Sequence, residues 1–316
     1  MCFLAAPEVT VVGEAMVERR ADGASGFGGD ALNVAVYLSR LGVRARLASA
    51  VGTCVASADL LAALEAEGVD TRSVLIEPFG ELGAYAIALD AMGERAFSYD
   101  RSRSPFTRWQ ASDALGSGSK DTLFLSGITL AVLPPAARQR LLERVREHRQ
   151  AGGQAAFDTN YRPTLWRSAE KANAMLREAL AAADVALVGA DDARALGLDP
   201  HALIDAAMSE GCEVACLKDG ARTVRFWTQR EKRTLTFTPA PVVDATAAGD
   251  AFDAGFLAAW ASLGDAAVAV RAGQRLAAHV VGHPGALCPK DGTPSLANLT
   301  HGAEPDGSSP WSGRLA

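Results

Sequence analysis

Apolar residues recur along this chain in two alternating patterns. Short runs rich in Val, Ala and Leu predict strands, and longer segments with apolar residues three or four positions apart predict helices. The predicted strands span 9–13, 44–51, 123–125, 155–158, 185–188 and 214–218, and the predicted helices span 31–41, 59–67, 135–150, 169–182, a segment after Asp199 and much of 251–281. Regular alternation of this kind predicts an α/β fold with a doubly wound, mostly parallel sheet flanked by helices.

Between residues 83 and 99 the pattern changes to two extended segments around a turn. Ala84–Asp90 and Arg95–Tyr99 flank the short stretch 91–94, which predicts a β-hairpin. Together with residues near 14–27, the hairpin region 80–105 predicts a small β lid over one edge of the sheet. We expect a single domain over residues 1–301 and a poorly ordered tail over 302–316, which is rich in Gly, Pro and Ser.

The composition argues against several classes of protein. Apolar residues make up 49% of the chain, charged residues 22%, and the net charge is −6, so nucleic acid is not an expected partner. No apolar run reaches the ~18 residues of a membrane span, and the N-terminal residues lack the basic region of a secretory signal. The five cysteines are scattered, which predicts reduced thiols and a cytoplasmic protein.

The segment Asp244–Asp250 carries the clearest chemical signal. Small residues between two aspartates lead into an apolar helical stretch, and the preceding Thr234–Pro239 and Val242–Val243 predict a strand. A strand, a turn of small residues and a helix N-terminus expose backbone N–H groups that can bind a phosphate. Asp250 can take a proton from a hydroxyl, so the segment favours phosphoryl transfer to an alcohol. The alternative is a simple tight turn in which an aspartate caps the helix.

Two motifs together resemble those of a known family. Asp244–Asp250, Asp-Ala-Thr-Ala-Ala-Gly-Asp, is similar to the Asp-Thr-x-Gly-Ala-Gly-Asp signature of ribokinase-like (PfkB) carbohydrate kinases, and Gly28–Asn33, Gly-Gly-Asp-Ala-Leu-Asn, is similar to their second signature. The resemblance extends over residues 9–289. Four further stretches are similar to the 2-keto-3-deoxygluconate kinase branch of this family: 26–38, 93–101, 125–133 and 157–166.

The resemblance implies an ATP- and Mg²⁺-dependent sugar kinase, with or without a monovalent cation. Asp250 is then the general base, and the backbone of Ala248, Gly249 and Asp250 holds the charge that builds on the transferred phosphoryl group. Ala247 replaces the glycine that is most common in the family, so we expect an ordinary φ there. Ala245 replaces a threonine.

The same resemblance implies which residues bind the sugar. Gly29, Asp30 and Asn33 lie in the second signature, where Asp30 is alternatively only a helix cap. Tyr85, Tyr99 and Arg101 lie on the lid hairpin, and the period of two puts Tyr99 and Arg101 on one side. Such residues are also common on a plain solvated strand face.

Arg162 follows a strand end, where ligands of open α/β sheets bind. It suits the C1 carboxylate of 2-keto-3-deoxygluconate, which ribose and fructose lack.

For the nucleotide, the resemblance implies Asn160, Lys218, Gly220, Ala247 and Gly249, and no dedicated protein ligands for a metal. Lys218 at a strand end is alternatively a plain surface residue. The family's Asn-x-x-Glu element, linked to Mg²⁺ and phosphate, is only half present, because Gly189 stands at the Asn position and Asp192 at the Glu position.

Two alternatives stay open at this point. One is a kinase of a neutral sugar, of the fructokinase or ribokinase type, against which the charged Arg162 and Arg101 argue. The other is a sugar-acid sensor without catalysis, suggested by the departures at Ala245, Ala247 and Gly189, against which Gly249 and Asp250 argue. The lid also exposes sheet edges, which proteins usually cover, so a homodimer through the lids is expected.

Overall fold

The computed structural model describes residues 6–20, 23, 25–89, 95–110, 115, 121–301 and 309–310. Its main sheet has ten strands in the order β14-β13-β12-β11-β10-β9-β8-β1-β4-β5. Neighbours from β11 to β5 are parallel, and β12, β13 and β14 add antiparallel pairs at one edge. The strands of this sheet are β1 (Glu8–Val12), β4 (Arg44–Val51), β5 (Val74–Ile76), β8 (Thr122–Ser126), β9 (Gln154–Asp158), β10 (Val185–Gly189), β11 (Val214–Asp219), β12 (Thr223–Thr228), β13 (Lys232–Thr236) and β14 (Ser309–Pro310).

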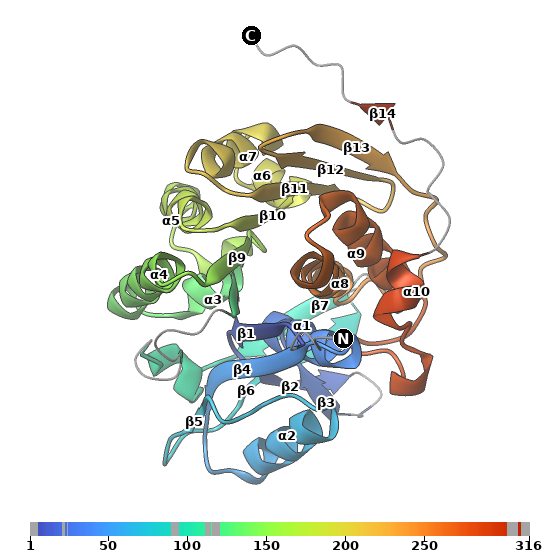
Figure 1. Ribbon diagram of the computed structural model, residues 1–316. Coiled ribbons are helices and arrows are strands. Elements are labelled where there is room, and N and C mark those ends of the chain that lie inside the picture. Colours follow the sequence, from blue (N-terminus) through green and yellow to red (C-terminus); the bar gives the residue numbers. More distant parts are fainter. Residues whose placement is uncertain are drawn as a thin grey trace.

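Helices cover both faces of the sheet (Figure 1). They are α1 (Asp30–Arg40), α2 (Val55–Ala66), α3 (Gly127–Val132), α4 (Pro135–Gln150), α5 (Ala169–Ala181), α6 (Ala190–Ala195), α7 (Pro200–Ser209), α8 (Ala248–Leu263), α9 (Ala266–Val280) and α10 (Leu296–Thr300). The predicted doubly wound α/β class is confirmed. The strand order reverses between β1 and β8, so a crevice opens beyond their carboxyl ends.

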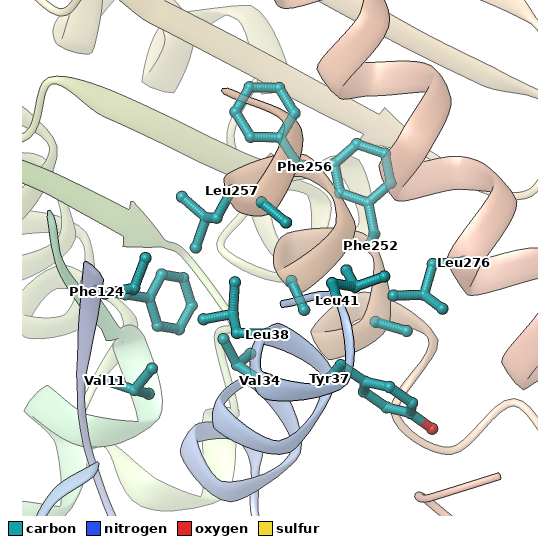
Figure 2. Close-up of a cluster of buried hydrophobic side chains, with 14 of the residues drawn as sticks. Val11, Val34, Tyr37, Leu38, Leu41, Phe124, Phe252, Phe256, Leu257 and Leu276 are labelled. Carbon is teal, nitrogen blue, oxygen red and sulfur yellow. The ribbon is translucent and has the colours of Figure 1, made fainter. Parts of the chain in front are cut away.

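Two hydrophobic cores lie on opposite faces, because side chains alternate along each strand. Val11 of β1 packs with α1, α8 and α9, whereas Val12 packs with the core that contains α4, α5 and α7. Figure 2 shows the first core, in which Val34 and Leu38 of α1 belong to the same cluster of side chains as Phe252 and Leu257 of α8. The packing of α1 against α8 brings together the two helices that carry the family signatures.

A separate sheet of four strands has the order β3-β2-β6-β7. Its strands are β2 (Met16–Arg20), β3 (Ser25–Gly28), β6 (Gly83–Leu89) and β7 (Arg95–Asp100). The predicted hairpin is confirmed as the antiparallel pair β6–β7, and its turn, 90–94, lies outside the described residues. The contribution of residues near 14–27 is also confirmed, because β2 pairs with both β3 and β6.

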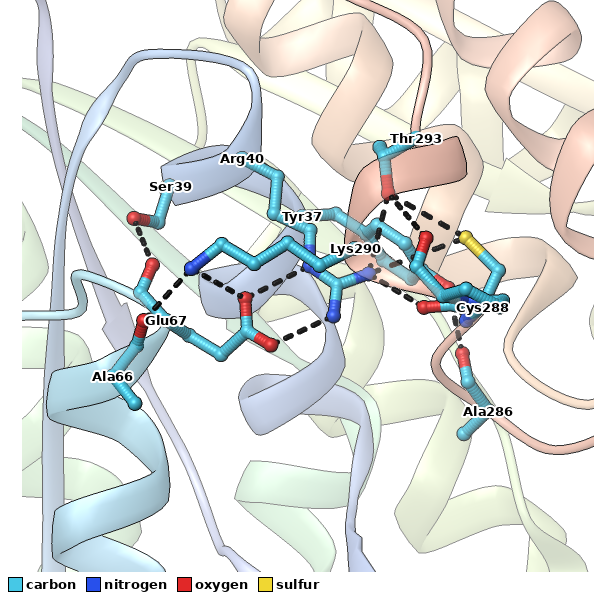
Figure 3. Close-up of polar contacts among 10 residues, drawn as sticks. Tyr37, Ser39, Arg40, Ala66, Glu67, Ala286, Cys288, Lys290 and Thr293 are labelled. Carbon is cyan, nitrogen blue, oxygen red and sulfur yellow. Dashed lines mark hydrogen bonds and ion pairs between the residues drawn. The ribbon is translucent and has the colours of Figure 1, made fainter.

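The segment after α9 is tied to α1 and α2 by polar contacts (Figure 3). Arg40 forms a two-bond pair with Glu67, at 2.9 and 2.8 Å, and donates to the Cys288 carbonyl at 2.8 Å. Tyr37 donates to the Ala286 carbonyl and accepts from the Cys288 amide. These bonds hold the 286–288 segment beside α1.

One predicted strand is wrong. Val242 and Val243 lie outside any strand and are each 62% exposed, because Pro239 and Pro241 lack the N–H groups that a strand ladder needs. Val243 instead donates its N–H to the Val281 carbonyl.

Two predictions concern the ends of the chain and its surroundings. Within the predicted tail only Ser309–Pro310 is described, where it pairs with β13. Over the described part of the chain, every helix is too short or too polar to cross a lipid bilayer.

Candidate active site

Three adjoining cavities lie at the carboxyl ends of the parallel strands, around the N-terminus of α8. The first has a volume of 590 Å³ and opens between the lid and the sheet; we call it the acceptor cavity. It contains Glu14, Met16, Gly29, Asp30, Asn33, Tyr85, Tyr99, Arg101, Ile128, Asn160, Arg162, Pro163, Thr164, Leu165, Ala245, Thr246, Ala247 and Asp250. All the residues predicted to bind sugar therefore lie around one cavity.

The second cavity, of 570 Å³, lies on the other side of the turn formed by residues 244–250. We call this cavity the donor groove. Its wall includes Lys218, Gly220, Ala248, Gly249 and apolar residues of α8 and α9. A smaller cavity of 230 Å³, the passage, is bordered by Asn160, Arg162, Lys218 and residues 247–250. Each predicted site residue thus borders at least one of the three cavities.

The 244–250 turn is held by its first aspartate. Asp244 accepts hydrogen bonds from the Thr246 amide at 2.8 Å and the Gly285 amide at 2.7 Å. Ala247 has φ 62° and ψ 14°, in the left-handed region, so the expectation of an ordinary φ at this position is wrong. The geometry of the turn overrides the preference of alanine, at a local cost of about 1–2 kcal/mol.

The start of α8 presents backbone donors to the passage. Ala248 donates weakly to the Ala245 carbonyl at 3.3 Å, whereas no acceptor in the described chain is recorded for the Gly249 and Asp250 amides. Gly249 and Asp250 both border the passage, and a Cβ on Gly249 would meet no atom within 4 Å. Open N–H groups at a helix N-terminus form an anion site.

Asp250 lies where the acceptor cavity meets the passage. Its Oδ2 accepts a hydrogen bond from Asn33 Nδ2 at 2.7 Å. Burial, and then the nearby Asp30 carboxylate, raise the pKa of Asp250 to about 6, against the opposing effect of the Asn33 hydrogen bond. A carboxylate with this pKa is ionised at neutral pH and is a stronger base than an ordinary aspartate.

Asp30 is the first residue of α1, and the cap position belongs to Gly29. The capping alternative for Asp30 is therefore wrong. Gly29 has φ 120°, and a Cβ there would lie 2.9 Å from the Glu14 carbonyl, so the position needs glycine. Asp30 accepts hydrogen bonds from Ser126 Oγ and, at 3.2 Å, from Asn160 Nδ2. Burial raises the pKa of Asp30.

Arg101 already has a partner, Glu14, which the sequence analysis missed. Its Nε donates to Glu14 Oε2 at 2.6 Å, and the two side chains are only 16% and 3% exposed. Glu14 directly follows a glycine at the end of β1. This position at a strand end was the feature of the sequence that could have identified Glu14 as a site residue.

Arg162, in contrast, is 51% exposed and donates to the Tyr161 carbonyl at 3.0 Å. Its guanidinium is therefore the more accessible positive charge of the acceptor cavity.

The lid contributes two tyrosines. Tyr85 is buried and donates its hydroxyl to Glu18, and Gly28 makes room for it, because a Cβ there would lie 2.2 Å from that hydroxyl. The Arg101 guanidinium lies 4.7 Å from the centre of the half-exposed Tyr99 ring. The prediction that Tyr99 and Arg101 share one side of the lid is confirmed.

Lys218 is not a plain surface residue. Its Nζ lies 2.9 Å from Asp158 Oδ1 and 2.8 Å from Asp253 Oδ1. Burial alone would lower the Lys218 pKa, but the two carboxylates outweigh it and raise the value. Asp158 and Asp253 were missed by the sequence analysis, although Asp253 follows Asp250 by three residues on the same helix. The three side chains tie the first turns of α8 to the ends of β9 and β11.

The remaining predicted residues occupy the junction. Asn160 borders both the acceptor cavity and the passage and has φ 28°. Gly220 lies in the wall of the donor groove. Gly189 and Asp192 border the passage, at the carboxyl end of β10.

Comparisons with known proteins agree with this arrangement. The model of the pfkB family carbohydrate kinase matches residues 6–291. The chain is 35% identical to 2-dehydro-3-deoxygluconokinase of Escherichia coli strain K12 over 308 residues, which cover 91% of this chain and 99% of that one. It is also 35% identical to the protein of that name from Dickeya dadantii, with 91% and 98% covered.

A solved structure of fructokinase with bound ATP from Xylella fastidiosa has the same fold. The TM-score is 0.80 at 24% identity, with 92% of this chain and 96% of that one covered. The family model and the two relatives each match most of the chain, and we conclude that this protein belongs to the pfkB family of carbohydrate kinases.

Proposed function

We propose that this protein uses ATP to phosphorylate the terminal (C6) hydroxyl of 2-keto-3-deoxygluconate, giving 2-keto-3-deoxy-6-phosphogluconate. One observation carries the proposal. The acceptor cavity contains a carboxylate that can act as a base, Asp250, next to an anion site, and it also contains an accessible guanidinium, that of Arg162. The relatives named 2-dehydro-3-deoxygluconokinase support the same substrate.

At the reacting end, Asp250 takes the proton of the hydroxyl as the oxygen attacks the γ-phosphorus. A new oxygen–phosphorus bond forms, the bond to the leaving β-phosphate oxygen breaks, and ADP departs. The Gly249 and Asp250 amides stabilise the charge on the transferred group. Asn33 Nδ2 orients the base, while its Oδ1 is buried and has no hydrogen-bond partner in the described chain. A hydroxyl of the sugar is a suitable donor for that oxygen.

Arg162, which borders both the acceptor cavity and the passage, binds the C1 carboxylate through paired hydrogen bonds. Arg101 is held by Glu14 and contributes mainly to the shape of the cavity beside Tyr99. Gly29 and Tyr85 complete the wall, and Asp30 accepts from a sugar hydroxyl. Neutral sugars offer no carboxylate to the Arg162 guanidinium, so this residue sets the preference for an acid.

The donor groove and the passage suit a nucleotide with its metal. Gly220 allows close approach of the nucleotide, and Asn160, Ala247 and Gly249 border the passage where the phosphates would lie. Within the described residues no group of three His, Cys, Asp or Glu side chains could hold a metal ion. Mg²⁺ usually keeps several waters and binds through substrate phosphates and one or two carboxylates; when bound, it would neutralise charge on the phosphates.

The test is a coupled ADP-release assay with ATP and Mg²⁺, comparing 2-keto-3-deoxygluconate, 2-keto-3-deoxygalactonate, fructose and ribose. We expect strong turnover of the keto-deoxy acids alone. Turnover of fructose or ribose at similar kcat/KM would replace the proposal with a neutral-sugar kinase. Sugar-acid binding by calorimetry without turnover of any substrate would indicate a sensor.

Three further expectations are tested alongside. Repeating the assay in K⁺, Na⁺ and choline salts tests the monovalent cation. Light scattering tests the proposed homodimer through the lids, and cell fractionation tests the cytoplasmic location.

A further inference from the structure

Gly189 and Asp192 border the passage without a role in the proposed reaction. Gly189 is the last residue of β10, and Asp192 lies in the first turn of α6. These two residues stand at the Asn and Glu positions of the half-present Asn-x-x-Glu element. The contacts that the two residues make in the structure indicate their role better than the resemblance to that element does.

The Asp192 carboxylate has a defined partner on each oxygen. Oδ2 accepts a hydrogen bond from Thr159 Oγ1 at 2.7 Å, and Thr159 Oγ1 in turn accepts from the Gly189 amide at 3.0 Å. Oδ1 lies 3.7 Å from Arg162 Nη1. The Asp192 side chain is 15% exposed. The Thr159 hydrogen bond fixes the orientation of the carboxylate, and Oδ1 faces the Arg162 guanidinium.

Gly189 makes this orientation possible. A Cβ at position 189 would lie 2.6 Å from Asp192 Oδ2, closer than real Cβ contacts allow, and 3.0 Å from its Cγ, so the carboxylate would have to move. The backbone there has φ −78° and ψ 126°, which any residue adopts. Glycine is therefore needed at position 189 only because the Asp192 carboxylate occupies the space where a Cβ would lie.

We infer that Asp192 is a positioning residue for Arg162, held by Thr159 and accommodated by Gly189. The inference rests on the proposed function, since Arg162 borders both the acceptor cavity and the passage. A half-exposed arginine loses side-chain freedom when it binds a carboxylate. Asp192 restrains that freedom beforehand, from the side away from the sugar acid, and so lowers the KM for substrates that carry a carboxylate.

The test measures steady-state kinetics of Asp192→Asn, which keeps an oxygen that can accept from Thr159. We expect KM for 2-keto-3-deoxygluconate to rise roughly 3- to 10-fold, because the variant loses an ion pair in which one partner is partly exposed and the other is buried. The kcat, the KM for ATP and the Mg²⁺ requirement should stay within about 2-fold of the wild type, because the Asp192 carboxylate contacts Thr159 and Arg162 rather than the residues proposed to bind the nucleotide. In an Arg162→Ala background, Asp192→Asn should add nothing, since the two effects then share one pathway.

Gly189→Ala is the second variant, because the new methyl group would displace the carboxylate. We expect the same rise in KM, whereas Gly292→Ala, where a Cβ meets nothing within 4 Å, serves as the matched control. A loss of kcat with a raised Mg²⁺ requirement in Asp192→Asn would overturn the inference and assign Asp192 to the phosphate side. An unchanged or lower KM would also overturn it, since repulsion of the substrate acid would then dominate.

The two proposals fail in different ways. If the wild type does not turn over the keto-deoxy acid, the proposed function fails, and calorimetric binding of the acid to the wild type and Asp192→Asn still tests the positioning role. If the wild type is active and Asp192→Asn is unchanged in KM, only the positioning role fails.

Discussion

Asn33 donates a hydrogen bond to Asp250 across 217 positions of sequence, at 2.7 Å. The two residues belong to the two family signatures, and the packing of α1 on α8 brings them together. The bond orients the carboxylate toward the acceptor cavity and leaves the Asn33 oxygen for a sugar hydroxyl. Under the proposed function, this one contact couples substrate binding to the orientation of the base.

Asp250→Asn should abolish turnover while sparing sugar binding. Loss of a general base typically costs about 10²–10⁴-fold in rate, and the amide still fits beside Asn33. Single-turnover kinetics and calorimetry with the sugar acid check the two parts. Because the Asp250 pKa is raised on folding, its charge disfavours the fold above pH 6, so the variant should be equally or more stable at pH 8. Turnover close to that of the wild type would exclude Asp250 as the base.

The pH profile should report the raised pKa of Asp250. Only the carboxylate accepts a proton, so kcat/KM should fall as pH drops below about 6, tenfold per pH unit. Asp30→Asn removes a nearby negative charge and should move this acidic limb of the pH profile to lower pH. Arg162→Ala removes a positive charge and should move the limb to higher pH. A limb that stays in place in both variants would show that another group controls it.

Arg162→Ala should weaken binding of the sugar acid more than any lid substitution. The expected loss is about 2–5 kcal/mol if the substrate buries the charged pair, and Arg162→Lys should recover only part of it, because lysine lacks the paired donors. Calorimetry with 2-keto-3-deoxygluconate measures the loss, with Tyr99→Phe as the control. Undiminished affinity in Arg162→Ala would remove this role.

Lys218→Met should destabilise the fold strongly, because it leaves Asp158 and Asp253 facing each other in a buried site. The expected loss is about 3–5 kcal/mol in the free energy of unfolding by urea. Lys218→Met combined with Asp253→Asn should recover part of the loss. If the single variant keeps wild-type stability but loses affinity for ATP, Lys218 acts on the nucleotide instead.

Ala247→Gly should stabilise the protein slightly. Alanine in the left-handed region costs about 1–2 kcal/mol, part of which is offset by the greater freedom of glycine in the unfolded chain. We expect a net gain of roughly 0.5–1 kcal/mol with unchanged kcat. A drop in stability would mean that the left-handed turn needs the methyl group of Ala247.

The periodicity of the sequence predicted most of the parallel strands of the main sheet and the longer helices, but it missed β5, β12 and the short helices α3, α6 and α10. Helix 135–150 and strand 44–51 were predicted to their ends, since their boundaries are set by local signals such as Pro135 and the hydrophobic pattern. Val242–Val243 was misassigned, because two apolar β-branched residues resemble a strand while the neighbouring prolines prevent one. The φ of Ala247 was mispredicted because the turn is held by the hydrogen bond from the Gly285 amide to the Asp244 carboxylate, which is a tertiary contact.

For the site, the motifs of the sequence and their resemblance to a known family determined many of the residues that border the cavities, but not Glu14 or Asp158, nor Asp253 beside Lys218. Only the tertiary structure decided how their charges are paired. Arg101 is held by Glu14, Lys218 by Asp158 and Asp253, while Arg162 stays half-exposed beside Asp192. Whether a charge is available to a ligand depends on neighbours that are distant in sequence and on burial, and both are set only when the chain has folded.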